Sequence, residues 1–340
     1  MAGYWGYHSY RGRTPRWKYV LAVVLVAVIL AAVGFIVLQE RVVYDESGIP
    51  HLRLPEKQTV EPEQPEETVE LTIQGPEKAE AVYVYSVPTG KLTMDAYMTA
   101  AASSQFHNAC AVTLKDSTGK VWFDSAAAVS GATQAAPDTE EALKRFADAG
   151  YDIARLACFH DSRAANSDVE GMGLKNTGGY IFYDGNNSQW LDPAKPAARQ
   201  YLCRMAAEAA ELGFDEVLLT DVSYPTQGKL DKIAYGDGDK DANLTAFLEE
   251  MRAALEPYSV ALSIELPEVV ITTGADEDAG LRLAEIAPLV DRIYARTESE
   301  RVDTLTAAVA AAGTAEFVPE LTAGLPDGKG SYLLLSENAD

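Results

Sequence analysis

One long apolar segment near the N-terminus constrains this chain more than any other feature. The twenty residues from Tyr19 to Leu38 carry no charged side chain. A helix of about 20 apolar residues is long enough to cross the hydrocarbon core of a bilayer. Four basic residues and no acidic one precede the segment, and basic flanks stay on the cytoplasmic side. We therefore expect a cytoplasmic basic tail over residues 1–18, a transmembrane helix over 19–38, and an extracytoplasmic remainder at the cell membrane.

Two other interpretations of this apolar segment are a cleaved signal peptide and a buried core helix. A signal peptide has an apolar region of about 7–15 residues and ends at a small-residue cleavage site. This run is longer and is followed by Gln39, Glu40 and Arg41, so a retained anchor is favoured. A core helix would carry a polar face toward solvent, and the segment has no charged residue to mark one.

The composition argues against several classes of partner and site. The 340 residues carry a net charge of −23, which disfavours nucleic acid because its binding depends on Lys and Arg. Cys110, Cys158 and Cys203 are odd in number and widely spaced, which is neither a disulfide framework nor a zinc pattern. The alternating acids around Asp239 lack the glycine and the closing glutamate of a calcium loop. We expect no metal and no cofactor.

Residues 39–78 differ in composition from the rest of the chain. They include the run PEKQTVEPEQPEETVE, which is rich in proline and glutamate and contains no aromatic residue. Such a segment cannot bury enough apolar surface to offset its ordering entropy. We therefore expect a disordered stalk that holds the next domain away from the membrane.

From residue 79 to residue 340, short β-branched runs alternate with longer helical stretches. This repetition favours a parallel sheet, and the number of runs fits a (β/α)8 TIM-type barrel. An open doubly wound sheet is the alternative, but no GxGxxG or Walker A pattern follows the first strand. The predicted strands are 81–86, 109–115, 153–159, 216–221, 260–265, 291–295, 316–319 and 332–335, and the predicted helices are 91–103, 139–149, 196–212, 243–255, 278–289 and 299–312.

Polar and charged side chains stand at the carboxyl ends of these predicted strands. In a TIM-type barrel the active site lies at those ends. A catalytic mouth needs such residues, although many strand-to-loop transitions also show them. The residues that we expect at the mouth are Lys115, Asp116, Arg155, His160, Asp161, Asp221, Tyr224, Glu265 and Glu320.

A long connection, from Ser162 to Asp192, follows the third predicted strand. It contains Tyr180, Tyr183 and Trp190 together with several amide side chains. Aromatic rings can stack on the apolar faces of sugars, and amides can bond their hydroxyl groups. This loop, with Trp190, is therefore expected to bind carbohydrate. A self-packed loop with a buried tryptophan is the alternative.

Four segments of the predicted barrel carry a recognisable pattern. They are NACAVTLKDSTGKVWFDS, YDIARLACFHDS, the WLDP of residues 190–193 and the GFDE of residues 213–216. Together they resemble a family of bacterial glycoside-hydrolase-like proteins that is related to the α-amylase-type barrels. The resemblance covers nearly all of the chain after residue 79. It implies a TIM-type barrel that acts on a polysaccharide or an oligosaccharide.

The chain departs from the family pattern at the end of the fourth predicted strand. Thr220 and Ser223 stand where the family has Asp and Arg, and Asp221 stands where it has Tyr. Because side chains alternate along a strand, a displacement by one residue is expected to turn the carboxylate to the opposite face. Glycoside hydrolysis normally needs two carboxylates across the scissile bond. We expect Asp221 as base or nucleophile and Glu265 as general acid.

These observations lead to one main hypothesis and two alternatives. The main hypothesis is a membrane-anchored, extracytoplasmic glycoside hydrolase that acts on a cell-envelope or extracellular polysaccharide. The first alternative is a catalytically degenerate barrel that binds carbohydrate or serves as an envelope scaffold, as the replacements at Thr220 and Ser223 would allow. The second alternative is a plain structural ectodomain.

Overall fold

The chain divides into two units, Met1–Leu71 and Thr72–Asp340. The computed structural model describes residues 42–44, 50–52, 81–103, 107–148, 150–236, 238–323 and 330–335. In the first unit, β1 (Val42–Tyr44) and β2 (Pro50–Leu52) form an antiparallel pair, so a hairpin lies in the predicted stalk. The predicted transmembrane segment 19–38 lies outside the described residues. No helix within the described ranges is long and apolar enough to span a membrane.

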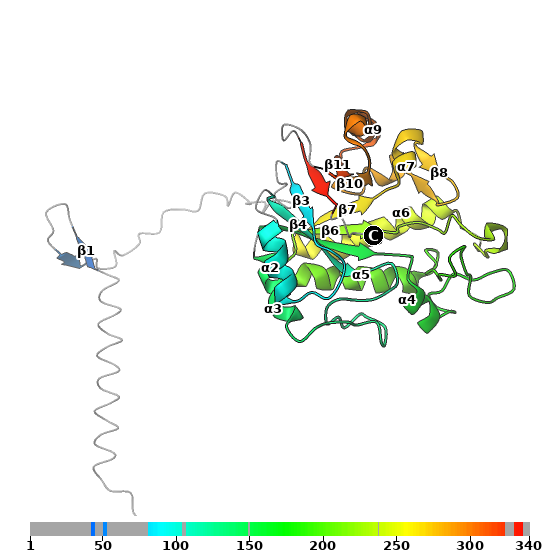
Figure 1. The fold of residues 1–340 in the computed structure, drawn as a ribbon, viewed down its shortest axis with the longest axis horizontal. Coiled ribbons are helices and arrows are strands. Elements are labelled where there is room, and N and C mark those ends of the chain that lie inside the picture. Colours follow the sequence, from blue (N-terminus) through cyan, green and yellow to red (C-terminus); the bar gives the residue numbers. More distant parts are fainter. Residues whose placement is uncertain are drawn as a thin grey trace, which may run out of the picture. The chain divides into compact units, whose positions relative to one another are not determined.

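The second unit is built around a closed barrel of eight parallel strands, as the sequence predicts (Figure 1). Around the barrel the strands follow one another in chain order, and the last strand pairs with the first. Most are short apolar runs, which is typical of parallel strands that are buried on both faces. The strands are β3 (Tyr83–Ser86), β4 (Ala109–Lys115), β5 (Tyr151–Ala157), β6 (Glu216–Thr220), β7 (Ala261–Glu265), β10 (Arg292–Arg296), β11 (Glu316–Leu321) and β12 (Tyr332–Leu334).

Helices surround this barrel, and the two sixteen-residue helices α5 (Pro196–Glu211) and α6 (Lys240–Leu255) pack side by side (Figure 1). The other helices are shorter, and a small two-stranded hairpin accompanies them. These elements are α2 (Met94–Ser103), α3 (Thr139–Ala147), α4 (Ser162–Ser167), η1 (Leu230–Lys232), η2 (Glu256–Tyr258), α7 (Glu268–Thr273), β8 (Ala275–Asp276), β9 (Leu281–Arg282), α8 (Leu283–Ile286), η3 (Ser299–Arg301) and α9 (Val302–Ala312).

The segment between β7 and β10 differs from the prediction. A single helix over 278–289 is predicted, whereas the structure has α7, the β8–β9 hairpin and the four-residue α8. Gly274 and Gly280 adopt φ angles of +87° and +77°, a left-handed conformation that glycine enters without steric cost. Gly274 ends α7, and Gly280 interrupts the predicted helix just before β9.

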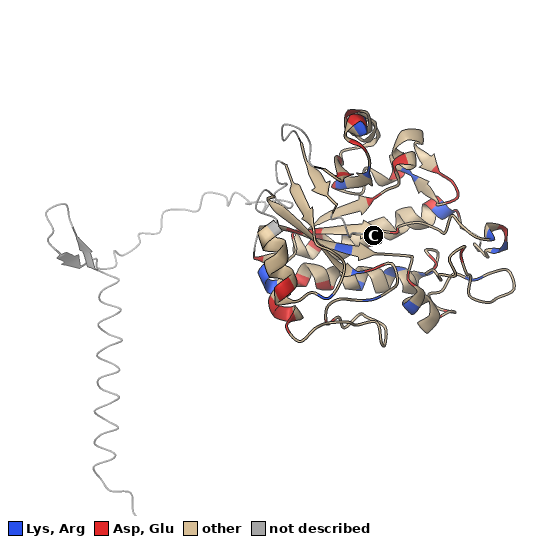
Figure 2. Ribbon diagram, in the orientation of Figure 1, with Lys and Arg blue, Asp and Glu red and all other residues tan. Residues whose placement is uncertain are grey.

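The charges of α3 follow the direction of the helix dipole. The helix begins with Glu140 and Glu141 and has basic residues in its last turn (Figure 2), which is the arrangement that the macrodipole favours. Asp138 precedes the helix, and its side chain does not cap α3. It accepts a hydrogen bond of 2.9 Å from the amide of Met94 instead, and so joins α3 to the start of α2.

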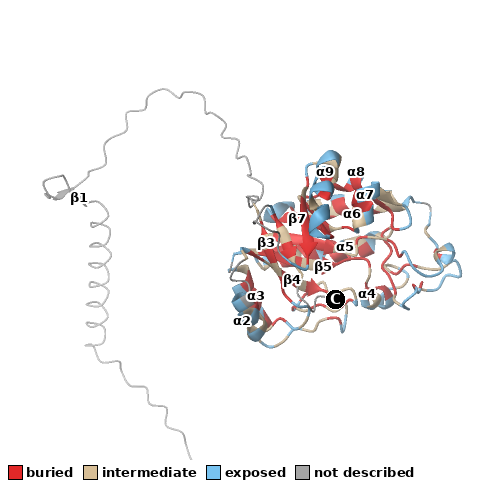
Figure 3. Ribbon diagram, turned by 45° about the horizontal axis from the view of Figure 1, so that its top comes forward, coloured by how far each residue is buried: buried red, intermediate tan, exposed pale blue. Residues whose placement is uncertain are grey.

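Two apolar cores stabilise the barrel unit. The larger core lies between the strands and the surrounding helices, and Figure 3 shows buried residues concentrated in the strands and exposed residues on the outer helices. The smaller core fills the barrel interior. Its members recur at every second position because successive strand side chains point to opposite faces. They are Val82, Val84, Ala109, Ala111, Ile153, Leu218, Tyr294, Val318 and Leu333.

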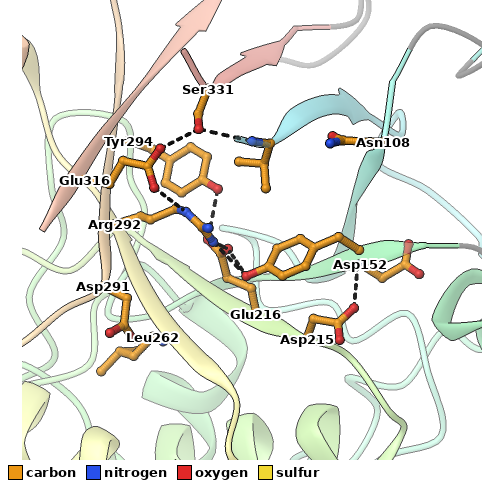
Figure 4. A network of polar contacts seen from close by, with 12 residues as sticks. Asn108, Asp152, Asp215, Glu216, Leu262, Asp291, Arg292, Tyr294, Glu316 and Ser331 are labelled. Carbon is orange, nitrogen blue, oxygen red and sulfur yellow. Dashed lines mark hydrogen bonds and ion pairs between the residues drawn. The ribbon is translucent and has the colours of Figure 1, made fainter. Parts of the chain in front are cut away.

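A buried polar network closes the amino-terminal end of the barrel (Figure 4). Arg292 and Glu216, the first residues of β10 and β6, form an ion pair whose two side chains are at most 1 % exposed. Arg292 also donates to the Tyr151 hydroxyl over 2.7 Å and to Glu316 over 3.1 Å. The Tyr294 hydroxyl donates to Glu216 over 2.9 Å. Mutual pairing and added hydrogen bonds are the conditions under which a protein tolerates buried charges.

Arg292→Met is expected to lower the free energy of unfolding by about 3–5 kcal/mol, because it leaves the Glu216 carboxylate buried without its charge partner. Urea unfolding followed by circular dichroism measures this change. The matched control is Arg282→Met, which removes a partly exposed pair with Asp241 and is expected to cost at most about 1 kcal/mol. Equal losses in the two variants would contradict a special role for the buried pair.

Candidate active site

Three charged side chains meet at the carboxyl-terminal end of the barrel. Arg155 and Glu320 lie two residues beyond Ile153 and Val318 of the inner core, and Glu265 ends β7. Arg155 Nη2 lies 2.6 Å from Glu265 Oε2 and 3.7 Å from Glu320 Oε1. Because both distances start at one nitrogen, these two oxygens are at most 6.3 Å apart.

Glu320 is the most deeply buried member of this trio. The residue is 2 % exposed, and its Oε1 makes no hydrogen bond with the described residues, because Arg155 Nη2 stays 3.7 Å away. Burial, and next the neighbouring Glu265 carboxylate, raise the pKa of Glu320 to about 7, while Arg155 and Arg296 act in the opposite direction. Glu320 therefore keeps its proton up to near-neutral pH.

Asp221 reaches the same region through an unusual backbone conformation. β6 ends at Thr220, and Asp221 follows with a φ of +52°, in the left-handed region that aspartate enters more readily than most residues. Side-chain alternation stops there, and both Asp221 and Glu265 line one cleft. The Asp221 carboxylate therefore does not turn to the opposite face, contrary to the prediction from sequence. That prediction holds only for an extended strand, and the backbone at Asp221 is not extended.

The surroundings of Asp221 disfavour its charged form. Burial contributes most to the raised pKa of its carboxyl group, and the Glu265 carboxylate raises it further. His160, Lys115 and Arg155 act in the opposite direction. A carboxyl group that resists ionisation beside a second carboxylate is the arrangement from which enzymes build a proton donor.

The cleft that contains Asp221 and Glu265 has a volume of about 360 Å³. One of its walls comes from the β8–β9 hairpin, which sequence analysis missed and which the flanking Gly274 and Gly280 could have indicated. Arg296, the last residue of β10, and Glu268, the first residue of α7, also line the cleft. The full lining is Asp221, Val222, Ser223, Thr226, Glu265, Leu266, Pro267, Glu268, Asp276, Ala279, Leu281 and Arg296.

Lys115, Asp116 and Asp161 make their contacts within the protein. Lys115 and Asp161 form an ion pair of 2.9 Å with both side chains fully buried. Asp161 also caps α4 by accepting a hydrogen bond of 2.8 Å from the amide of Ala164. Asp116 Oδ1 accepts from the Thr118 amide over 2.9 Å, which fixes the turn after β4. These three residues position strand ends, and none of them lines the cleft.

The aromatic residues predicted at the mouth are also largely enclosed. His160 and Trp190 stack with ring centroids 4.5 Å apart and an interplanar angle of 11°. Trp190 is 9 % exposed, and its Nε1 donates to Asp184 over 2.9 Å, as the self-packed alternative for this loop expects. Tyr224 is fully buried, and its hydroxyl accepts a hydrogen bond of 3.0 Å from the side-chain Nδ2 of Asn243.

Residues 81–296 match the family described as "Putative glycosyl hydrolase domain". The glycoside hydrolase domain of PgaB (BpsB) from Bordetella bronchiseptica is 13 % identical, with a TM-score of 0.54, and the match covers 76 % of this chain and 94 % of that chain. A hypothetical protein from Ruminiclostridium thermocellum is 26 % identical, with a TM-score of 0.46, over 54 % of this chain and 96 % of that chain. No curated protein matches the chain.

Glu320→Gln is expected to change how stability depends on pH. Folded Glu320 keeps its proton up to a pH of about 7, whereas the unfolded chain loses it near the ordinary pKa of 4.5. Because the unfolded state then binds fewer protons, wild-type stability falls as the pH rises between these two values. The glutamine variant has no such proton to lose. Its free energy of unfolding is therefore expected to exceed that of the wild type by about 1–3 kcal/mol at pH ~8.

Thermal unfolding of both proteins at pH ~5 and pH ~8 measures this effect. The two melting temperatures should lie close together at the lower pH and separate at the higher pH. A variant that is no more stable than the wild type at the higher pH would contradict the raised pKa of Glu320.

Proposed function

Because the chain belongs to the glycosyl hydrolase domain family that its residues 81–296 match, we propose that its barrel hydrolyses a polysaccharide through Asp221 and Glu265. One observation carries this proposal: two carboxyl groups, at the ends of the paired strands β6 and β7, line one cleft. That cleft lies at the end of the barrel where TIM-type enzymes bind substrate. Two carboxyl groups at one cleft are the usual requirement for cleavage of a glycosidic bond.

The electrostatic surroundings assign different roles to the two groups. Burial and the Glu265 carboxylate raise the pKa of Asp221, which suits a general acid that protonates the leaving oxygen. Arg155 forms an ion pair of 2.6 Å with Glu265, which holds this carboxyl group in place for the role of base or nucleophile. These roles are the reverse of those expected from sequence, because the sequence does not indicate which acid contacts the arginine.

A catalytically degenerate barrel that binds glycan without cleaving it is the second candidate. Thr220 and Ser223 occupy the positions of the family's Asp and Arg. In addition, Glu265 is already ion-paired with Arg155, and a substrate would have to compete with that contact. Such a protein would keep the cleft and its affinity for glycan and would lack turnover.

The cell membrane is the proposed location, with residues 19–38 as the anchor and the barrel on the extracytoplasmic side. The uncharged run and the basic residues that precede it support this proposal. A barrel tethered there would meet cell-envelope and extracellular polysaccharides, which are therefore the proposed substrates.

Asp221→Asn and Glu265→Gln are each expected to lower kcat by about 10²–10⁴-fold, because each removes one proton-transferring or charge-stabilising group. Release of reducing ends from neutral β-glucan, cationic chitosan, anionic alginate and purified cell-wall glycan measures the activity. The matched control is Asp303→Asn, which changes an exposed acid on α9 and should leave kcat unchanged. A wild type that binds one of these polymers and releases no reducing ends would favour the degenerate barrel.

Deletion of residues 1–38 is expected to move the protein from the membrane fraction to the soluble fraction, because it removes the whole apolar run. Fractionation of cells that express the full chain or the deletion variant measures the change. Protease added to intact spheroplasts should digest the barrel of the full chain. Full-length protein in the soluble fraction would contradict the anchor.

A further inference from the structure

We propose that a second groove at the same end of the barrel binds sugar units of the glycan that enters the cleft, a proposal that rests on the proposed function. This loop groove has a volume of about 730 Å³, within the ~300–1,000 Å³ that ligand sites usually have. Six of its lining residues carry the argument: Thr177, Tyr180, Tyr183, Asn187, Lys229 and Lys232.

The loop groove lies between two connections that follow the neighbouring strands β5 and β6. The amide of Thr177 donates to the carbonyl of Lys232 over 2.8 Å, which joins the two connections. Gly228 has a φ of +101°, and a Cβ at this position would lie 2.9 Å from the Gly185 amide nitrogen. The two connections therefore meet backbone to backbone at Gly185 and Gly228, and a side chain at Gly228 would not fit there. The groove has fixed walls, so a ligand need not order them on binding.

A network around one carboxylate holds the floor of the groove in place. Asp184 Oδ1 accepts hydrogen bonds of 2.8 Å from the amides of Asn186 and Ser188. Its Oδ2 accepts the bond of 2.9 Å from Trp190 Nε1. Asp184 is 9 % exposed, and its oxygens are occupied by these donors. It therefore shapes the loop, and its oxygens are engaged within the protein.

Two aromatic rings stand open to solvent in this groove. Tyr180 is 76 % exposed and Tyr183 is 52 % exposed, in a unit whose other large aromatic side chains mostly lie in the cores. Apolar surface that gathers at one exposed place is typical of a binding site. A tyrosine ring offers a flat apolar face and a polar hydroxyl, which matches the alternating C–H and hydroxyl surfaces of a pyranose.

The polar residues around the tyrosines favour a sugar over an apolar peptide or a lipid. Thr177 and Asn187 offer hydroxyl and amide groups, and Lys229 and Lys232 offer ammonium donors. A sugar can pair its hydroxyl groups with these polar side chains, whereas a lipid tail or an apolar peptide side chain would leave them unused.

The groove and the cleft belong to one packed region. Trp190, which is bonded to the groove floor, stacks on His160. The amide of Phe159, the residue before His160, donates to the carbonyl of Asp221 over 3.1 Å. Asp184 of the groove is thus linked to Asp221 through Trp190, His160 and Phe159. A glycan several units long can occupy both sites, which would favour polymers over short oligosaccharides.

Affinity electrophoresis of the full chain in gels that contain β-glucan, chitosan, alginate or purified cell-wall glycan tests this proposal. In a gel that retards the wild type, the double variant Tyr180→Ala/Tyr183→Ala is expected to show a Kd about tenfold higher. Tyr258→Ala is the matched control, because Tyr258 is an exposed tyrosine outside the groove.

The outcomes separate this proposal from the proposed function. Unchanged retardation of the double variant, with circular dichroism like that of the wild type, overturns the sugar-binding groove. A wild type that no gel retards overturns it as well. Retardation that depends on Tyr180 and Tyr183, without release of reducing ends, supports the groove and overturns hydrolysis.

Discussion

The ion pair between Arg292 and Glu216 is the contact on which the closed barrel most depends. It joins β10 to β6 across the floor of the barrel, where a charge without a partner would be costly. At the opposite end the balance is different, because Asp221 and Glu320 lie near Glu265, and burial together with that neighbour raises the pKa of both. The same kinds of side chain therefore stabilise one end of the barrel and give the other end two carboxyl groups with raised pKa values. This difference in pairing distinguishes a structural floor from a reactive mouth.

Most of the barrel could be predicted because its strands are buried on both faces and so read as apolar runs. β4 begins and ends at the predicted residues, and α5 begins at Pro196, as a proline in the first helical turn favours. The predicted end of β5 is two residues late, because Cys158 and Phe159 are as apolar and buried as strand residues. The β8–β9 hairpin was missed because strands of two residues have no periodicity.

The candidate site could be predicted only in outline. Strand ends meet at one edge of a parallel barrel, so the position of Arg155, Glu265 and Glu320 follows from the strand assignment. Lys115 and Asp161 also lie at or just after the ends of strands, but they form a buried ion pair with each other. Their burial depends on distant residues such as Tyr201, whose hydroxyl donates to Asp161 over 3.3 Å. Local sequence contains no information on such neighbours, so it cannot separate charges of the cleft from charges of the core.

The left-handed backbone of Asp221 bears on how related sequences are compared. The left-handed backbone at the first residue after β6 lets the Asp221 carboxyl group line the cleft together with Glu265. A search that requires an acid at Thr220, where the resembled family pattern has Asp, would overlook this neighbouring acid. Under the proposed function, substitution alone, without an insertion or a deletion, displaces the acid by one residue and keeps it at the cleft. Homologues that lack the expected acid are better judged by the residue that follows it.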